Sequence, residues 1–262
     1  MISIVIPTFN SEKIIIELCN KIQNYISKDD EIIIINDSST DKTSEKLSLL
    51  NKEYENVNIY DLKTNIGQVG STLLGIKVSK GDVIITMDDD FQHDPKFIPK
   101  LVNELNSKKS EAVVAKWDLD ETFSRNFGSF MFTIISSLVI FKIPNFRNTA
   151  YRAISKEVKK DFFNFFVSRY WLDPRRLSSK VLQLNVGHNP QDFRPYSSFK
   201  SRLSLAFKHL IIDSYLLQIL TIGILYTNLI SLLITAFTIS LIQRLIKRNT
   251  ELKRKKVYEV FE

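Results

Sequence analysis

Short apolar runs alternate with amphipathic segments along the first half of the chain. The runs are rich in β-branched residues, which predicts buried strands at Met1–Pro7, Glu31–Asn36, Val57–Tyr60, Val83–Met87 and Ala112–Ala115. Between them, apolar residues recur at helical spacing, which predicts a helix capped by Ser11 and further helices at about 42–54, 67–79 and 95–107. Uninterrupted apolar strands separated by helices are typical of a parallel sheet covered on both faces. We therefore predict a doubly wound α/β domain.

Acidic residues follow two of these predicted strands. Asp37 comes after the second strand, and Asp88-Asp89-Asp90 comes directly after the fourth. Ligands of such sheets bind outside the carboxyl ends of the strands, so we expect both groups to face one crevice. A solvated acidic loop, or an Asx turn organised by Asp37, is the plainer alternative. The shared position at strand ends favours a binding site.

The spacing of the second acidic group suggests a metal. Carboxylates two residues apart at a strand end can face one cation, so Asp88 and Asp90 suit Mg²⁺ or Mn²⁺ bridging a diphosphate. His93 and His209 lack partners at ligand spacing, so we do not expect either to bind metal. No Walker lysine motif and no Gly-x-Gly-x-x-Gly occurs, which argues against a P-loop or a dinucleotide site.

The same crevice would hold a nucleotide. Asp37 would accept hydrogen bonds from the base or the ribose, and other candidates come from the ends of the first strand and the third predicted helix. These further candidates for nucleotide binding are Pro7, Phe9, Glu12, Asn65 and Gln68.

The C-terminal quarter has a different pattern. Residues 199–213 place apolar side chains opposite Lys200, Arg202 and Lys208, which predicts an amphipathic interfacial helix. Residues 214–243 carry no charged side chain, a stretch longer than the roughly 20 residues that cross a bilayer. We predict a membrane segment here, either a re-entrant hairpin or a single span, with a segment buried in a soluble core as the alternative. Residues 244–262 form a basic tail.

The net charge of +7 on 262 residues belongs almost entirely to this C-terminal part. Residues 199–262 carry +6, which leaves +1 for residues 1–198. The N-terminal domain is therefore nearly neutral, which argues against nucleic acid as a partner. The basic residues that flank the uncharged stretch would instead meet anionic lipid headgroups.

Several segments together resemble the family 2 glycosyltransferases of the GT-A fold. The likeness is greatest to the polyprenyl-phosphate sugar transferases, which include dolichol-phosphate mannose synthase and bacterial undecaprenyl-phosphate glycosyltransferases. The segments that carry it are 4–10 (IVIPTFN), 35–41 (INDSSTD), 65–68 (NIGQ), 81–95 (GDVIITMDDDFQHDP) and 151–154 (YRAI). The resemblance implies a GT-A domain over residues 1–198, with a Rossmann-like, mostly parallel sheet. Amphipathic and membrane-embedded helices would follow it.

The resemblance also implies roles for individual residues. Asp37 and Glu12 would contact the nucleoside, and Asp89 would lie beside the ribose or diphosphate. The metal would be surrounded by Asp88, Asp90 and Gln92, with Asp90 also counted as catalytic. The implied reaction is a single displacement at the anomeric carbon of a nucleotide sugar, with inversion.

Two departures from the family bear on the acceptor. No carboxylate occurs at 145–149, where relatives carry a candidate base, so Asp173 or Asp94 would have to serve a hydroxyl acceptor. A lipid phosphate needs little deprotonation, because its second pKa is roughly 6. The family's His-x-x-Arg is replaced by His188-Asn-Pro-Gln, so the lipid phosphate would be held by Arg152, Arg194 and Lys200.

We therefore expect a Mg²⁺- or Mn²⁺-dependent hexosyltransferase at the cell inner membrane, with its catalytic domain cytoplasmic. It would use a nucleotide-sugar donor and a polyprenyl phosphate acceptor. One alternative is transfer to a hydroxyl of a lipid-linked glycan in surface-polysaccharide assembly. A second is a catalytically inactive, nucleotide-binding membrane scaffold, and homo-oligomer formation is left open.

Overall fold

The computed structural model describes most of the predicted α/β domain. The described residues are 1–108, 110–117, 149–159 and 180–186, together with residues 238, 240, 241 and 244. The segments predicted as an amphipathic helix, a membrane segment and a basic tail lie outside them, apart from those four helical positions. No helix among the described residues is long and apolar enough to cross a membrane.

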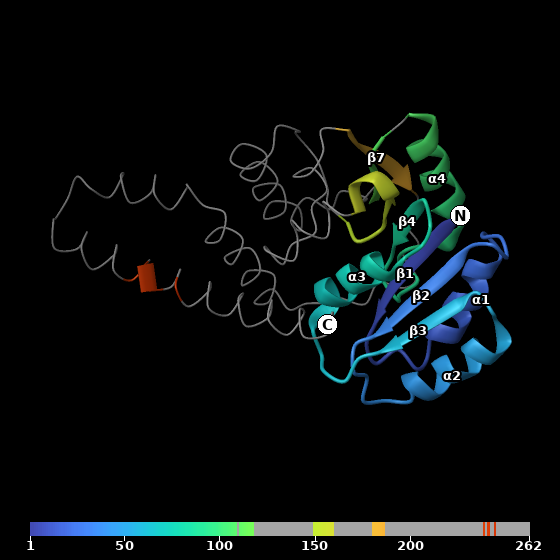
Figure 1. Ribbon diagram of the computed structural model, residues 1–262, viewed down its shortest axis with the longest axis vertical. Coiled ribbons are helices and arrows are strands. Elements are labelled where there is room, and N and C mark those ends of the chain that lie inside the picture. The colour runs from blue at the N-terminus through green and yellow to red at the C-terminus, as the bar shows by residue number, and fades with distance from the viewer. Residues whose placement is uncertain are drawn as a thin grey trace, which may run out of the picture. The chain divides into compact units, whose positions relative to one another are not determined.

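Strands and helices alternate along the first part of the chain (Figure 1). The strands are β1 (Ile2–Thr8), β2 (Glu31–Asn36), β3 (Val57–Asp61), β4 (Val83–Thr86), β5 (Ala112–Trp117), β6 (Arg152–Ser155) and β7 (Val181–Val186). The helices are α1 (Ile15–Gln23), α2 (Thr43–Glu53), α3 (Gly67–Val78) and α4 (Ile98–Ser107), with a 3₁₀ turn η1 (Pro95–Phe97) before α4. Every strand and helix predicted up to Ala115 is confirmed.

These strands form one sheet in the order β3-β2-β1-β4-β6-β5-β7. Strands β1 to β4 are parallel to one another, and β5 is parallel to β7. The exception is β6, which runs antiparallel between β4 and β5. The mostly parallel sheet is confirmed, whereas β6 and β7 were not predicted. All seven strands belong to one of the two compact units of the chain.

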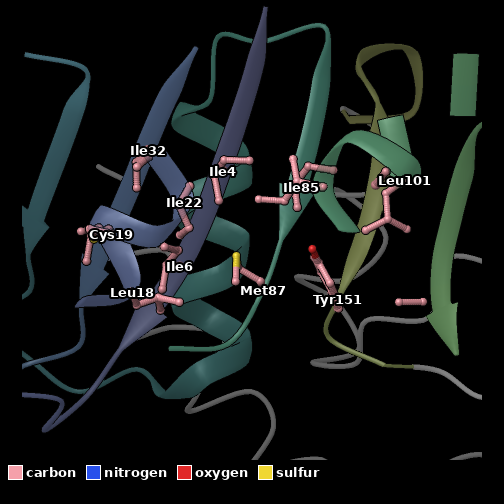
Figure 2. Packing of buried hydrophobic residues seen from close by; sticks show 14 of the residues in the cluster. Ile4, Ile6, Leu18, Cys19, Ile22, Ile32, Ile85, Met87, Leu101 and Tyr151 are labelled. Carbon is pink, nitrogen blue, oxygen red and sulfur yellow. The ribbon is translucent and has the colours of Figure 1, made fainter. Parts of the chain in front are cut away.

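Each face of the sheet is covered by its own helices, because the strands carry apolar residues on both sides. On one face, Ile4, Ile6 and Ile32 pack with residues of α1, α2 and α4, including Leu18 and Leu101 (Figure 2). On the other face, residues of α3 pack on β1, β2 and β4. Doubly wound packing is therefore confirmed for the described residues.

Helix α3 lies unusually close to the sheet. A Cβ atom on Gly75 would lie 2.2 Å from Cγ1 of Val5, so no larger residue fits without displacing the Val5 side chain on β1. This close packing holds the C-terminal half of α3 against β1.

The predicted cap of α1 is wrong. The helix begins at Ile15 with Ile14 as its N-cap, and no side chain caps it. Ser11 contributes its carbonyl oxygen, which accepts from the amides of Ile14 and Ile15 at 3.1 Å. Its hydroxyl is directed elsewhere, because it bonds to an aspartate of the loop after β4.

Candidate active site

Four strands present their ends at the same edge of the sheet. Strands β1 and β2 end in register at Thr8 and Asn36, and β4 ends at Thr86. Because β6 is antiparallel, its first residue Arg152 pairs with Thr86 at this same edge. The loops that follow β1, β2 and β4, the start of α3 and the start of β6 therefore meet here, as expected for a doubly wound sheet.

Side chains tie the loop after β1 to the loop after β2. The side-chain oxygen of Asn10 accepts from the amide of Thr40 at 2.8 Å, and the amide of Asn10 donates to the hydroxyl of Ser39 at 2.9 Å. The carboxylate of Glu12 accepts from the amide of Lys42 at 2.9 Å, at the start of α2. Both loops turn through left-handed residues, Asn10 with φ 54° and Ser38 with φ 62°. These bonds hold both turns in place.

Asp37 joins the end of β2 to the start of α3. Its carboxylate accepts from the amide of Ile66 at 2.7 Å and from the amide of Gly67 at 2.8 Å. The side-chain amide of Asn65 donates to the carbonyl oxygen of Asp37 at 3.0 Å. Burial raises the pKa of Asp37, and the two backbone hydrogen bonds oppose this shift. Gly67, with φ 80°, has the left-handed backbone that glycine adopts without strain.

Asp88 lies where the start of α3 meets the end of β4. Its Oδ1 accepts from Nε2 of Gln68 at 2.5 Å. Burial raises the pKa of Asp88 to about 6, although 26% of the side chain remains exposed. The hydrogen bond from Gln68 and the positive charge of Arg152 oppose this rise. A carboxylate with a raised pKa gains from a cation placed beside it, because the cation stabilises the charged form.

Asp89 links the loop after β4 back to the loop after β1. Its Oδ2 accepts from the hydroxyl of Ser11 and, at 3.4 Å, from the amide of Phe9. Burial raises its pKa to about 6, and the neighbouring carboxylates Asp88 and Asp90 add to the rise. Together with the bonds between the loops after β1 and β2, the hydrogen bonds of Asp37, Gln68 and Asp89 form a closed ring through these two loops, the start of α3 and the loop after β4.

The third aspartate shapes its own loop. Oδ1 of Asp90 accepts from the amide of Gln92 at 3.2 Å, which closes a tight turn. Within the described residues, no three His, Cys, Asp or Glu side chains converge closely enough to hold a metal ion by themselves. Oxygen donors from Asp88 and Asp90 nevertheless suit Mg²⁺ or Mn²⁺, which are commonly bound by one or two carboxylates plus phosphate oxygens and water. The donor set fits a metal that arrives with a diphosphate.

Comparison with known proteins places this geometry in a family. The model of the family described as "Glycosyl transferase family 2" matches residues 3–197. The chain belongs to this family. The resemblance seen in the sequence is thereby confirmed, and the residues of the ring all fall within the matched part of this glycosyl transferase family 2 chain.

Among curated relatives, the family member named dolichol-phosphate mannosyltransferase from Pyrococcus furiosus is 32% identical over 117 residues, covering 44% of this chain and 33% of that protein. A dolichyl-phosphate beta-glucosyltransferase from Trichomonas vaginalis is 26% identical over 217 residues, covering 73% and 66%. An undecaprenyl-phosphate 4-deoxy-4-formamido-L-arabinose transferase from Aeromonas hydrophila is 29% identical over 164 residues, covering 61% and 44%. The chain thus spans between a third and two thirds of the length of these relatives.

Solved structures support the fold. Glucosyl-3-phosphoglycerate synthase from Mycobacterium tuberculosis, solved with Mn²⁺, uridine diphosphate and glucosyl-3-phosphoglycerate, gives a TM-score of 0.59 at 16% identity. The match covers 80% of this chain and 77% of that chain. At this identity the likeness shows a common fold, and the Rossmann-like sheet expected from the sequence is confirmed.

The structure brings most of the predicted site residues to this one edge. Those that lie there are Pro7, Phe9, Glu12, Asp37, Asn65, Gln68, Asp88, Asp89, Asp90, Gln92 and Arg152. Pro7 is buried at the end of β1, whereas 46% of Phe9 is exposed. Asp173, Arg194 and Lys200 lie outside the described residues, so their roles stay predictions, as do the ligand roles of the others.

Sequence reasoning missed two residues of this site. Ser11 was expected to cap α1, but its hydroxyl bonds to Asp89. From the sequence we expected of His93 only that it does not bind metal, but its imidazole accepts a hydrogen bond from the backbone of Asp88. The position of His93 directly after the Asp-x-Asp-x-Gln pattern indicated that it lies near the site. That pattern does not predict that the imidazole points into the core.

Proposed function

We propose that the protein is a metal-dependent, inverting glycosyltransferase that moves a hexose from a nucleotide sugar to polyprenyl phosphate. The observation that carries the proposal is the ring of hydrogen bonds around Asp88 and Asp89, which leaves two poorly solvated carboxylates at the ligand-binding edge of a glycosyl transferase family 2 domain. The names of three relatives, which refer to dolichyl or undecaprenyl phosphate, support this choice of acceptor.

The donor would occupy the crevice bordered by the ring. Phe9, Glu12 and Asn65 would face the nucleoside from the loops after β1 and β3. Asp37, with both oxygens bonded to backbone amides, would support the site by fixing the start of α3. Asp88, Asp90 and Gln92 would hold Mg²⁺ or Mn²⁺. Such an ion, when bound, neutralises the charge that grows on the departing diphosphate.

The proposed chemistry is a direct displacement. An oxygen of the acceptor phosphate forms a bond to the anomeric carbon, while the bond from that carbon to the diphosphate oxygen breaks. The nucleoside diphosphate leaves with the bonding electron pair, and the configuration inverts. The second pKa of a phosphate monoester is roughly 6, so this nucleophile is already ionised near neutral pH and needs little help from a base.

The acceptor phosphate would approach from the side of β6. Arg152 begins β6 at the same edge as Asp88, and its charge acts on the Asp88 carboxylate. It would stabilise an acceptor phosphate close to the donor diphosphate. Arg194 and Lys200 would add further positive charge, and the uncharged stretch 214–241 with its basic flanks would hold the enzyme on the cytoplasmic face of the inner membrane.

Incubation with undecaprenyl phosphate, Mn²⁺ or Mg²⁺ and a panel of labelled nucleotide sugars tests the proposal. A labelled lipid whose formation requires the metal is expected with at least one donor. The matched control is Asp90→Asn, which should make no product. Absence of lipid-linked product with every donor would overturn the proposal.

A second arm distinguishes the acceptor class. A hydroxyl acceptor requires a general base, for which Asp173 is the candidate. Asp173→Asn should therefore leave transfer to polyprenyl phosphate nearly unchanged. A large loss of turnover with unchanged donor binding would instead indicate a hydroxyl on a lipid-linked glycan. Donor binding without transfer to either acceptor would indicate a nucleotide-binding scaffold.

A further inference from the structure

His93 lies beneath the aspartate loop and contacts its backbone. The side chain is 3% exposed, and its Nδ1 accepts a hydrogen bond from the amide of Asp88 at 2.7 Å. An imidazole that accepts at Nδ1 is neutral and carries its proton on Nε2. His93 is therefore a fixed acceptor for one backbone amide of the loop.

The ring of His93 is itself held by a second buried side chain. It stacks on Tyr151 with the ring centroids 5.1 Å apart and the planes inclined by 29°. Tyr151 belongs to the same buried cluster as Met87 and Leu101 (Figure 2). Its hydroxyl donates to the carbonyl oxygen of Asp94 at 3.0 Å, and its own carbonyl oxygen accepts from Ala115 on β5 at 2.9 Å. The imidazole therefore has little freedom to move.

These contacts hold Asp88 from two sides. His93 holds its backbone from the core, and Gln68 holds its carboxylate from the surface. The amide of Met87, one residue earlier, donates to the carbonyl oxygen of Val5 on β1 at 3.1 Å. The loop that carries Asp88 to Asp90 thus has a fixed backbone before any ligand binds. A prearranged site loses less entropy when it binds its ligand.

We propose that His93 is a positioning residue that sets the affinity of the Asp88–Asp90 loop for a divalent cation and the diphosphate it accompanies. It acts through the backbone amide of Asp88 and touches neither ligand. The inference rests on the proposed function for the identity of the ligand, but the order that His93 imposes on the loop exists without one. Loop order and metal affinity can therefore be measured separately.

Two substitutions separate the hydrogen bond from simple packing. His93→Leu fills the buried space without an acceptor, whereas His93→Asn places an amide oxygen near the position of Nδ1. Leu101→Ala is the matched control, because it opens a cavity in the same core away from the aspartate loop. All variants are made in the full-length chain.

The first measurement needs no metal. Hydrogen–deuterium exchange over residues 86–92 should quicken about tenfold in His93→Leu, since the Asp88 amide loses its acceptor, and should stay near wild type in His93→Asn. The second measurement is Mn²⁺ affinity by electron paramagnetic resonance. His93→Leu should weaken it by about 10-fold or more, as loss of a group that orients a ligand does, and His93→Asn should restore most of it.

Loss of order in the aspartate loop should also change the steady-state kinetics. In His93→Leu the KM values for Mn²⁺ and the nucleotide sugar should rise, while kcat at saturating metal changes by less than about threefold, because no group that touches the reacting atoms is lost. Equal exchange and equal Mn²⁺ affinity in His93→Leu, His93→Asn and Leu101→Ala would overturn the proposal and leave His93 as packing alone. If wild-type protein binds no Mn²⁺, the proposed function fails, and the metal-free exchange rates still decide whether His93 orders the loop.

Discussion

The two edges of the sheet treat buried acidic residues in opposite ways. At the amino edge, Glu31 at the start of β2 is 5% exposed, and its carboxylate has partners on three sides. It accepts from the hydroxyl of Ser3 at 2.6 Å, from the amide of Lys80 at 2.7 Å and from the side chain of Asn58 at 3.2 Å. The chain itself satisfies this charge, so Glu31 joins β1, β2, β3 and the loop before β4.

At the carboxyl edge, the acidic residues have fewer hydrogen-bond partners for their charge. Within the described residues, the Asp88 carboxylate accepts one hydrogen bond, from Gln68, and burial raises the pKa of both Asp88 and Asp89 to about 6. These carboxylates are kept charged near neutral pH at a cost in stability. The comparison shows that burial of an acidic residue does not mark a ligand site by itself. Partial burial with few hydrogen-bond partners is the stronger indication, because a ligand can then supply the missing interactions.

The largest expected effect tests the carboxyl edge. Replacing Asp88 or Asp90 by asparagine should lower kcat/KM by about 1,000-fold or more, since metal charge stabilisation is worth several kcal/mol. Measured Mn²⁺ affinity should fall in parallel, while circular dichroism stays that of the wild type. Wild-type turnover in both variants would rule out a catalytic metal site at this edge.

The amino edge should respond in stability alone. Glu31→Ala leaves the Ser3 hydroxyl and the Lys80 amide without their acceptor, so the free energy of unfolding should fall by about 2–3 kcal/mol, measured by urea titration. Mn²⁺ affinity should change less than twofold in the folded protein. Glu55→Ala, at an exposed turn residue, is the control and should change neither quantity. Loss of metal affinity in Glu31→Ala would show that the two edges are not independent.

A smaller effect concerns pH in the metal-free protein. The pKa of Asp88 in the folded state is about 6, against an ordinary value of 3.8, so the folded state binds more protons between these values and stability falls as pH rises through that window. Asp88→Asn removes this cost, so its melting temperature should exceed that of the wild type at pH 7.5, with the difference shrinking as the pH falls below about 6 and vanishing below 3.8.

Asp82→Asn provides the control of opposite sign. The hydrogen bond and charge of Lys156 lower the pKa of Asp82, so its contribution to stability is present above its ordinary pKa and is lost as pH falls through the lowered value. Asp82→Asn should therefore melt slightly lower than the wild type at pH 7.5. A melting temperature of Asp88→Asn that also lies below that of the wild type at pH 7.5 would contradict the cost in stability assigned to the Asp88 carboxylate.

The smallest expected effect tests one bond in the ring of hydrogen bonds at the carboxyl edge. Ser11→Ala removes the hydroxyl that Asp89 accepts from, while the weaker bond from the Phe9 amide remains. One hydrogen bond to a charged group is worth about 1.5–3 kcal/mol, and water at this exposed rim can replace part of it. The affinity for the nucleotide-sugar donor should therefore fall about fivefold. Ser48→Ala, on an exposed turn of α2, is the matched hydroxyl deletion. Equal donor affinity in both variants would mean that the ring closes without Ser11.

The strands and helices up to Ala115 could be predicted because burial on both faces leaves long apolar runs in the sequence. The same logic failed for β6, whose four residues begin with a buried arginine and pair with strands about 40 and 70 residues away. Nothing local marks such a segment as an inserted antiparallel strand. β7 mixes buried, partly buried and exposed residues without strict alternation, and its signal was equally weak.

The candidate site was predictable as far as strand ends determine it. Asp37 and the three aspartates were located because strand ends converge in this type of sheet. The bonds that organise them were not predictable, because Asp37 reaches the backbone of α3 and His93 reaches back to Asp88 only after the loops have folded. The identity of a carboxylate can be predicted from its position, whereas its partners depend on tertiary contacts.

The antiparallel insertion of β6 has a consequence during synthesis. Strands β3, β2, β1 and β4 can assemble once residue 86 has left the ribosome, but the open edge of β4 must wait for residues 152–155. At about 5–20 residues per second, that delay lasts on the order of 3 to 15 s, during which an unpaired hydrophobic edge next to the aspartate loop is available for wrong pairing. The strand that completes the active-site edge would then also close the open edge of β4, and the outer edge of β5 would wait for residues 181–186.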